Sequence, residues 1–241
     1  IITTTTYRSS RNALQESNIE QINQITQATL ATVEQWVNDR KLDVITWAKD
    51  KTINACIEDS FVGKAARKSA NQYMADLVAS YPYYESINVA DASGLCIASS
   101  SEGVIEKEIN VGDRDYFKKA MTGEVAVSNV VTSHLSGKPI FCVAAPLSDG
   151  QSVVGVFFSV VKIDAFSDKF IKPVTVGQTG YAYITNADGL VIAHPKDAAI
   201  MKICLAELDF GKEILNNQSG VLTYDWEGIE KIVSYRHSPQ L

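Results

Sequence analysis

Apolar side chains recur every three or four positions along the first fifty residues. Between residues 10 and 50 no proline interrupts the chain, and Gln, Asn, Thr and Glu fill many of the remaining positions. This spacing places the apolar side chains on one face of an α-helix. At about 1.5 Å per residue, about forty helical residues reach roughly 60 Å, which is longer than a compact domain needs. We therefore predict a long amphipathic helix that pairs with a second copy or runs alongside several modules. Its apolar stripe comprises Ile22, Ile25, Leu30, Val33, Val37, Val44 and Trp47.

A second helical pattern covers residues 64–80 and is followed by short strand-like runs. Tyr81-Pro82 ends this helix, because the residue before a proline avoids the α region. From Ile87 onward, β-type runs alternate with Gly, Asp, Asn and Ser, which favour turns. The apolar runs 140–147 and 153–161 are far shorter than the roughly 20 residues that span a bilayer, so we predict buried strands. Membrane spans of a parent protein are expected to lie outside this stretch.

An internal repeat is the most informative feature of the pattern. Residues 87–99 align without gaps on residues 182–194, with identical Ala, Gly, Leu, Ile and Ala at equivalent places. Each copy is expected to be a strand, a tight turn and a second strand, with Gly94 or Gly189 supplying the positive-φ turn residue. Two such hairpins indicate a duplicated module, so we predict that Gly94 superposes on Gly189.

The segments after each hairpin also match. A short helix, a β run and a further strand follow in both copies, at 117–122, 123–131 and 140–145 in the first and at 212–216, 221–226 and 232–235 in the second. The first copy has another strand at 153–161, whose counterpart is expected beyond Leu241. Two antiparallel sheets with flanking helices, joined near 164–175, predict an α+β fold.

Composition and charge narrow the function. The chain is 46% hydrophobic and 21% charged, which is enough to bury a core. The net charge of −6, with no basic stripe, argues against nucleic acid as a partner. The sequence has no Gly-x-Ser-x-Gly, phosphate loop or His-Glu-x-x-His pattern, so we expect no enzyme, no catalytic residues and no cofactor.

The spacing of the four cysteines indicates buried side chains that pack in the core. Cys56, Cys96, Cys142 and Cys204 form no Cys-x-x-Cys pair, and the acidic residues have no EF-hand spacing, so no metal site is expected. Small buried thiols are the favoured interpretation. A Cys96–Cys142 bridge stays open, because it depends on whether their strands are neighbours.

At this point the chain resembles the double Cache sensor domains of bacterial chemoreceptors, sensor kinases and cyclases. The resemblance extends over essentially the whole chain, and the combination of motifs is specific although each one alone is not. The motifs are Val111-Gly-Asp-Arg-Asp-Tyr-Phe117, Ser136-Gly-Lys-Pro139 within 128–146, Val154-Gly-Val156, Val176-Gly-Gln-Thr-Gly-Tyr-Ala-Tyr-Ile184 and Asp188-Gly-Leu-Val-Ile-Ala-His-Pro195.

The resemblance implies an architecture and a location. It implies a long N-terminal helix over 1–54, a membrane-distal PAS-like module at 55–165 that binds the ligand, and a membrane-proximal PAS-like module at 166–241. Each module is an antiparallel sheet with flanking helices. The segment would lie outside the inner membrane, in the periplasm or extracellular space, as part of a homodimeric chemotaxis receptor.

The candidate ligand site centres on Arg114. A guanidinium in a concave pocket suits a carboxylate, because its fork donates two parallel hydrogen bonds. The resemblance implies that Tyr116 and Phe117 form the pocket wall beside it. The alternative from the residues alone is that Arg114 pairs with Asp113 or Asp115 and that both aromatic side chains belong to the core.

Departures from the family pattern suggest the ligand. Amino-acid-binding members carry Trp where this chain has Tyr116, a Tyr and an Asp where it has Val131 and Ser133, and an Asp in the last distal strand. Here that strand has Ser159, with Phe157 nearby. The missing acids imply that the pocket holds a carboxylate and lacks an ammonium partner. We therefore expect a small organic acid as ligand, with an amino acid as the second candidate.

Two histidines have candidate roles, and one other function competes with ligand sensing. His134, beside Ser133, is a candidate ligand contact or a surface turn residue, and His194 is expected to be structural. The competing function is a structural or dimerisation ectodomain without a ligand of its own.

Overall fold

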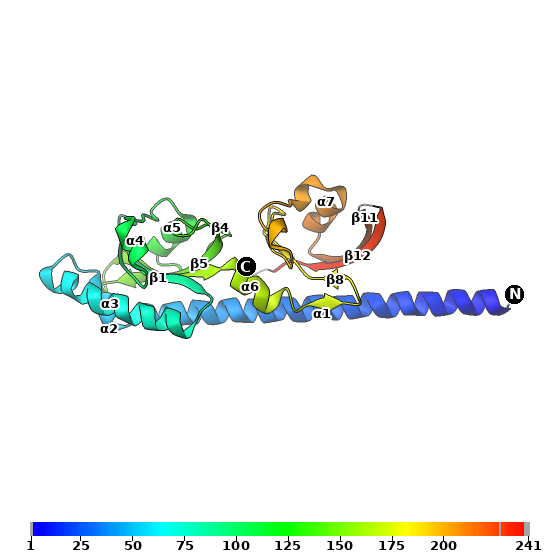
Figure 1. Cartoon of the computed structure of the whole chain (residues 1–241), viewed down its shortest axis with the longest axis horizontal. Helices are drawn as coiled ribbons and strands as arrows, with labels where there is room; N and C mark the ends of the chain where they lie inside the picture. Colours follow the sequence, from blue (N-terminus) through cyan, green and yellow to red (C-terminus); the bar gives the residue numbers. More distant parts are fainter. Residues whose placement is uncertain (1, 227, 239–241) are drawn as a thin grey trace. The chain divides into compact units, whose positions relative to one another are not determined.

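The structure is a computed structural model that describes residues 2–226 and 228–238 (Figure 1). The chain divides into two compact units. The larger unit is Trp36–Phe166, and the smaller unit combines Ile1–Gln35 with Ser167–Leu241. Helix α1 (Ile2–Ala48) and helix α6 (Ile163–Phe170) each contribute residues to both units.

Helix α1 confirms the long helix expected from the apolar stripe, because its 47 residues run without a break. Two capped helices follow it. The Asp50 side chain accepts a hydrogen bond from Thr52 N at 2.7 Å and so begins α2 (Lys51–Cys56). Ser60 Oγ accepts from Gly63 N at 3.0 Å at the start of α3 (Phe61–Ser80), which ends before Pro82 as predicted. Within the described residues, no helix is long and apolar enough to cross a membrane.

The larger unit is built on one antiparallel sheet with the strand order β2-β1-β6-β5-β3, and β4 also pairs with β5. Its long strand β6 lies between β1 and β5, so that Asn88 pairs with Phe158 and Val143 pairs with Ser159. The strands are β1 (Tyr84–Asp91), β2 (Cys96–Ser99), β3 (Ala126–Val127), β4 (Val131–Thr132), β5 (Pro139–Ser148) and β6 (Val153–Lys162).

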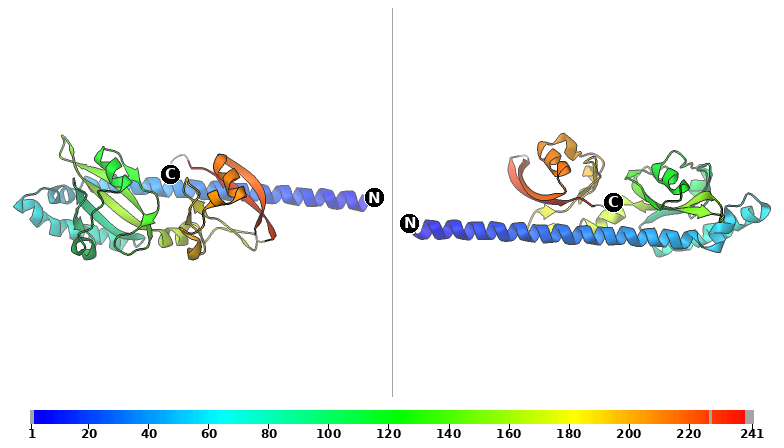
Figure 2. Two further views of the ribbon diagram at one scale, coloured as in Figure 1. Left: turned by 90° about the horizontal axis from the view of Figure 1, so that it is seen from above. Right: turned by 180° about the vertical axis from the view of Figure 1, so that it is seen from behind.

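Helices cover both faces of this sheet. The short helices α4 (Glu102–Glu106) and α5 (Asp115–Met121) lie on one face, and α3 with the end of α1 lies on the other (Figures 1 and 2). On the α1 side, Trp36 packs edge-on against Phe141 at 6.3 Å between ring centroids. On the α5 side, Tyr116, Phe158 and their neighbours form a buried apolar cluster.

The predicted β run 123–131 is two short strands instead of one. Ser128 lies between β3 and β4, where its N–H donates to the carbonyl of Cys142 at 2.9 Å and its Oγ accepts from Cys142 N at 2.8 Å. Because the Ser128 side chain, and not a backbone carbonyl, accepts the hydrogen bond from Cys142 N, the ladder of backbone hydrogen bonds is interrupted at this residue.

The smaller unit consists of short paired strands and helices. Its described strands form three two-stranded sheets, β10-β9, β11-β12 and β7-β8. Helix α7 (Asp209–Asn216) packs inside the curve of β11 and β12 (Figure 2). Ser234 on β12 donates to Asn23 of α1 at 2.6 Å. The strands are β7 (Thr175–Val176), β8 (Gly180–Tyr181), β9 (Ile184–Thr185), β10 (Val191–Ala193), β11 (Ser219–Trp226) and β12 (Ile229–Arg236), with short 3-10 turns at Asp197–Ala199 and Leu205–Glu207.

The two predicted hairpins have the same turn geometry. Gly94 and Gly189 both have φ of 86°. The N–H of Asp91 donates to the carbonyl of Leu95 at 3.0 Å, and Asn186 donates to Leu190 at 2.9 Å in the second copy. The segment that follows each hairpin comes back to its turn in the same way. The N–H of Val111 donates a hydrogen bond to the Gly94 carbonyl at 2.8 Å, and the N–H of Leu205 donates to the Gly189 carbonyl at 2.7 Å. Neither hairpin is helical, and the two units share the turn geometry and the return of the following segment.

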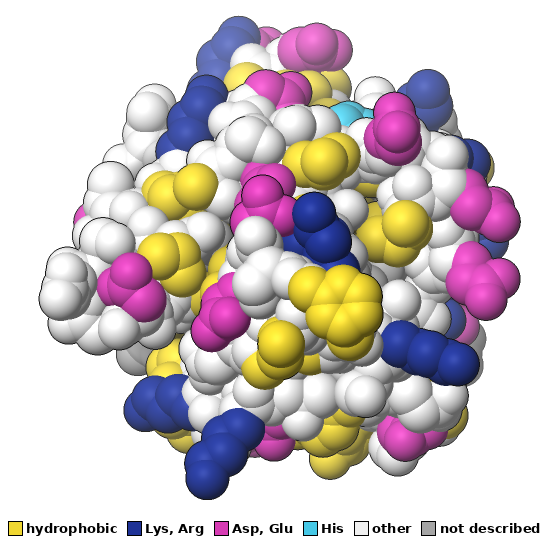
Figure 3. Space-filling model, turned by 90° about the vertical axis from the view of Figure 1, so that its left-hand side faces the viewer, with side chains coloured by type: hydrophobic (Ala, Val, Ile, Leu, Met, Phe, Trp, Pro, Cys, Tyr) yellow, Lys and Arg dark blue, Asp and Glu magenta, His cyan; other side chains and the backbone are white. Residues whose placement is uncertain are grey.

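The start of α3 presents apolar side chains to solvent. Phe61 is 89% exposed and Val62 is 69% exposed. Figure 3 looks onto this end of the chain and shows hydrophobic side chains interspersed with charged ones. Scattered apolar side chains of this kind are ordinary for a protein surface.

Candidate ligand-binding site

A cavity that is partly open to solvent lies against the α5 face of the sheet in the larger unit. Its floor comes from alternate residues of β1, β5 and β6, and its walls come from the segments around α4, α5 and β4. The lining is largely apolar with a few polar groups, as is typical of small-molecule sites. The principal lining residues are Glu85, Ser86, Asn88, Cys96, Ile109, Val111, Arg114, Tyr116, Val131, Thr132, Ser133, His134, Leu135, Ile140, Cys142, Phe158 and Val160.

Arg114 is the cationic group of the cavity. It precedes α5, and its guanidinium donates to the carbonyl of Thr132 at 3.4 Å and contacts Nε2 of His134. Its Nε lies 3.9 Å from Oδ1 of Asp113, a side chain that is 78% exposed. An ion pair this long and this exposed contributes little. The guanidinium therefore keeps donor capacity for an anionic ligand.

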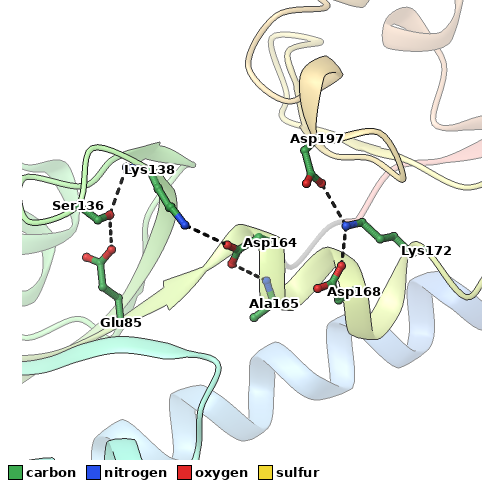
Figure 4. A network of polar contacts seen from close by, with 8 residues as sticks. All are labelled: Glu85, Ser136, Lys138, Asp164, Ala165, Asp168, Lys172 and Asp197. Atoms are coloured by element: carbon green, nitrogen blue, oxygen red, sulfur yellow. Dashed lines mark hydrogen bonds and ion pairs between the residues drawn. The ribbon is translucent and has the colours of Figure 1, made fainter.

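Glu85 is an acidic group of the same cavity, which the sequence analysis missed. Its Oε2 accepts a hydrogen bond from Ser133 Oγ at 2.5 Å, and its Oε1 accepts from Ser136 Oγ (Figure 4). Simple alternation would place Glu85 and Ser86 on opposite faces of β1. The pairing of β1 with β6 has an irregularity between Tyr84 and Ser86, which brings both side chains to the cavity.

The polar groups on the cavity floor pair with each other. Asn88 is 1% exposed, donates from Nδ2 to Ser86 Oγ at 2.9 Å and accepts at Oδ1 from Ser99 Oγ at 2.7 Å. A buried amide that is already bonded in this way stabilises the floor. The charged groups that line the cavity are thus the better candidates for ligand contacts.

Tyr116 and two cysteines form a neutral wall. The ring of Tyr116 is 5% exposed and lies 5.6 Å from the ring of Phe158. Burial raises the pKa of the Tyr116 hydroxyl and raises the pKa of the Cys96 and Cys142 thiols to about 12. These groups stay protonated at neutral pH. The four cysteines are free, and β2 is separated from β5 by β1 and β6, so the Cys96–Cys142 bridge is not formed.

The structure brings together five of the residues proposed from the sequence. Their side chains come from the start of α5 and from β4 with the turn after it. Arg114, Tyr116, Val131, Ser133 and His134 all line the cavity.

The other three proposed residues do not line the cavity. Phe117 is buried in the adjacent apolar cluster, on the next position of α5 after Tyr116. Phe157 and Ser159 lie on the opposite face of β6, and Phe158 and Val160 take their places at the cavity. Because successive strand side chains point to opposite faces, the neighbours of Phe157 and Ser159 are the residues of β6 that reach the cavity.

This α+β domain has a cavity lined by charges of both signs on one face of its sheet, an arrangement suited to binding a small molecule. A family model described as Cache domain, of the double Cache type, matches residues 10–241. The chain therefore belongs to the double Cache family of sensor domains.

Curated relatives are bacterial receptors and a kinase. The methyl-accepting chemotaxis protein TlpA of Bacillus subtilis is 28% identical over 133 residues, and TlpB is 24% identical over 133 residues. Both matches cover 54% of this chain and 19% of the relative. Sporulation kinase D of the same organism is 24% identical over 148 residues, 57% of this chain and 28% of the kinase. The matched part of this chain spans 19% to 28% of the length of these relatives.

Solved structures share the fold. The ligand-binding domain of the Pseudomonas aeruginosa amino acid chemoreceptor PctB with L-Arg has a TM-score of 0.70 at 16% identity, over 89% of this chain and 86% of that chain. The domain of the Pseudomonas fluorescens chemoreceptor CtaA with L-serine has a TM-score of 0.68 at 18% identity, over 90% and 89%. The extracellular domain of a putative histidine kinase, rpHK1S-Z16, has a TM-score of 0.66 at 17% identity, over 93% and 90%.

Proposed function

We propose that this chain is the ligand-sensing domain of a bacterial chemoreceptor and that its larger unit binds a small amino acid. The observation that carries the proposal is that Arg114 and Glu85 line the same cavity. The expectation of a simple organic acid rested on a cavity without an acidic partner. Glu85 removes that premise, so the organic acid becomes the second candidate.

The two charges suit the two ends of an α-amino acid. Arg114 offers a planar fork to the carboxylate, and Glu85 offers a carboxylate to the ammonium. An ammonium left unpaired in a dry cavity would cost several kcal/mol, which an acidic partner offsets. The apolar wall that includes Tyr116 and Phe158 would then hold the ligand's side chain. Support comes from the related domains solved with L-Arg, L-serine, asparagine and L-leucine.

The test is a thermal-shift panel of the common amino acids. Each amino acid is compared with its matched carboxylic acid, in which hydrogen replaces the amino group. A ligand at 100 times its dissociation constant should add about 2.7 kcal/mol of stability. We expect at least one amino acid to raise the melting temperature more than its matched acid does. If the matched acids stabilise the chain equally well or better, the organic-acid assignment holds instead.

Two variants connect this preference to the cavity. Arg114→Ala should weaken every carboxylate ligand by at least about 100-fold, because breaking a buried ion pair costs about 3–5 kcal/mol. Glu85→Gln should weaken the amino acid by about 10-fold or more and leave its matched acid unchanged. Glu124→Gln is the control, since Glu124 is exposed and does not line the cavity. If calorimetry finds that Glu85→Gln binds the amino acid as tightly as wild type, Glu85 does not contact the ammonium group.

We also propose a setting for the whole receptor. In this setting the chain would have three parts, which are a signalling helix at 1–54, a membrane-distal module at 55–165 and a membrane-proximal module at 166–241. The parent protein would lie in the cytoplasmic membrane as a homodimer, with this segment outside. Ligand would favour a closed state of the distal module and shift the long helix. A panel in which no compound stabilises the chain would favour the structural ectodomain instead.

A further inference from the structure

The smaller unit contains a second cavity, several of whose lining residues occupy positions that the internal repeat makes equivalent to those of the first. Tyr181 and Tyr183 line it, 95 residues after Ser86 and Asn88 of the first cavity. The correspondence continues through the second strand of each hairpin and the segment that returns to it. Val191, Ile203 and Leu205 stand where the first cavity has Cys96, Ile109 and Val111. The duplication therefore repeats the site as well as the fold.

Aromatic rings replace the charged groups of the first cavity. Phe210 of α7 and Tyr224 of β11 are stacked, with centroids 4.0 Å apart and planes 22° apart. Trp226 meets Phe210 edge-on at 5.9 Å. With Tyr181 and Tyr183, these rings give the cavity flat apolar walls. Such walls suit a planar ring, which stacks or packs edge-on against its neighbours.

The polar groups among the described lining residues are hydrogen-bond donors or neutral hydroxyls, and none of these residues is acidic. Lys231 on β12 supplies a positive charge. Nδ1 of His194 accepts from the N–H of Lys196 at 2.8 Å, so the hydrogen of the neutral ring is on Nε2. Burial raises the pKa of Tyr183, which keeps its hydroxyl uncharged. A ligand for this lining carries a negative charge on a flat apolar body.

We propose that the smaller unit binds a small aromatic carboxylate in this cavity, with its ring against Tyr224 and Trp226 and its carboxylate on Lys231. The proposal goes beyond the amino-acid function, since the two cavities share no residue. A quaternary ammonium ion would also find aromatic faces here. Lys231 would repel it, and no acid among the described lining residues would offset that repulsion.

The test uses benzoate as the probe and the 241-residue chain labelled with 5-fluorotryptophan. The chain has three tryptophans, of which Trp36 and Trp47 belong to the larger unit and Trp226 lies at the second cavity. Trp226→Phe assigns the third fluorine resonance. We expect benzoate to shift the Trp226 resonance, with Trp36 and Trp47 unchanged. Cyclohexanecarboxylate, which lacks an aromatic ring, should bind at least about 10-fold more weakly.

Variants separate this site from the first. Lys231→Gln should weaken benzoate by at least about 10-fold, and Lys202→Gln, an exposed lysine of the same unit, should leave it unchanged. Arg114→Ala should also leave it unchanged, even if it abolishes binding in the larger unit. The proposal is overturned if millimolar benzoate leaves Trp226 unshifted, if Lys231→Gln binds benzoate as wild type does, or if Arg114→Ala removes the shift. It is likewise overturned if tetramethylammonium shifts Trp226 at lower concentration than benzoate.

Discussion

At the scale of single residues, a few side chains decide what each cavity accepts. Arg114 and Glu85 are both engaged in the free cavity, the first with Thr132 and His134 and the second with Ser133 and Ser136. A zwitterion would replace contacts of both charges, because its two ends are complementary to the two side chains. Ser133 contacts Glu85 and His134 contacts Arg114, so under the proposed function the turn after β4 would respond when a ligand replaces these contacts.

We expect His194 to make the stability of the smaller unit depend on pH. Its side chain is 6% exposed, and burial lowers its pKa below the ordinary value of 6.5. At pH values well above 6.5 the ring is neutral in both states, so this contribution to stability is at its full value. As the pH falls below 6.5 the unfolded chain takes up a proton first, and stability declines until the folded-state pKa is passed. The slope for one proton is at most about 1.4 kcal/mol per pH unit.

Urea unfolding of the 241-residue chain between pH 7.5 and about pH 5 measures this decline. His194→Asn retains an acceptor for the Lys196 N–H without a titrating ring, so its stability should vary less with pH than that of wild type. Equal slopes for the two proteins would mean that His194 does not titrate differently on unfolding.

At the scale of elements, the repeated hairpin depends on its glycine. Gly94 has φ of 86°, and a Cβ there would lie 2.3 Å from the backbone N of Gly112. Gly123 has φ of 94° with nothing within 4 Å of the same position. Gly94→Ala combines backbone strain with a backbone clash, whereas Gly123→Ala has strain alone. We expect about 1 kcal/mol of destabilisation for Gly123→Ala and at least about 2 kcal/mol more for Gly94→Ala.

Chemical denaturation followed by circular dichroism compares these two variants directly. A Gly94→Ala protein as stable as Gly123→Ala would show that the segment carrying Gly112 can move aside at little cost. Because Gly112 belongs to the turn before Arg114, the same variant should also weaken ligands of the first cavity.

The elements predicted from the sequence depended on local patterns. The spacing of Ile22, Val33 and Val44 identified α1, and the Gly94 and Gly189 turns identified the hairpins, since these features arise from residues near in sequence. The bulge that turns Glu85 into the cavity depends on pairing with β6, more than seventy residues later in the chain. The choice between Phe157 and Phe158 required the register of the same strand, which alternation alone leaves ambiguous.

At the scale of the whole molecule, α1 bears on self-association. Residues 9–18 are exposed, and apart from Leu14 and Ala13 they are polar or charged. A face with so little apolar area provides a weak driving force for pairing. We expect the 241-residue chain to be largely monomeric at micromolar concentration by analytical ultracentrifugation. A tight dimer under those conditions would show that an interface has been overlooked, and Leu14→Glu would test whether α1 supplies it.

The central position of β6 also constrains how the larger unit is made. Its two neighbours, β1 and β5, are both synthesised before it, and pairs such as Tyr84 with Val161 join distant parts of the chain. Closing so long a loop costs conformational entropy before any contact compensates, which slows folding. On the ribosome, the hairpin of β1 and β2 must wait with an unpaired edge until Lys162 has emerged. During this interval the unpaired strand edge leaves the nascent chain open to aggregation.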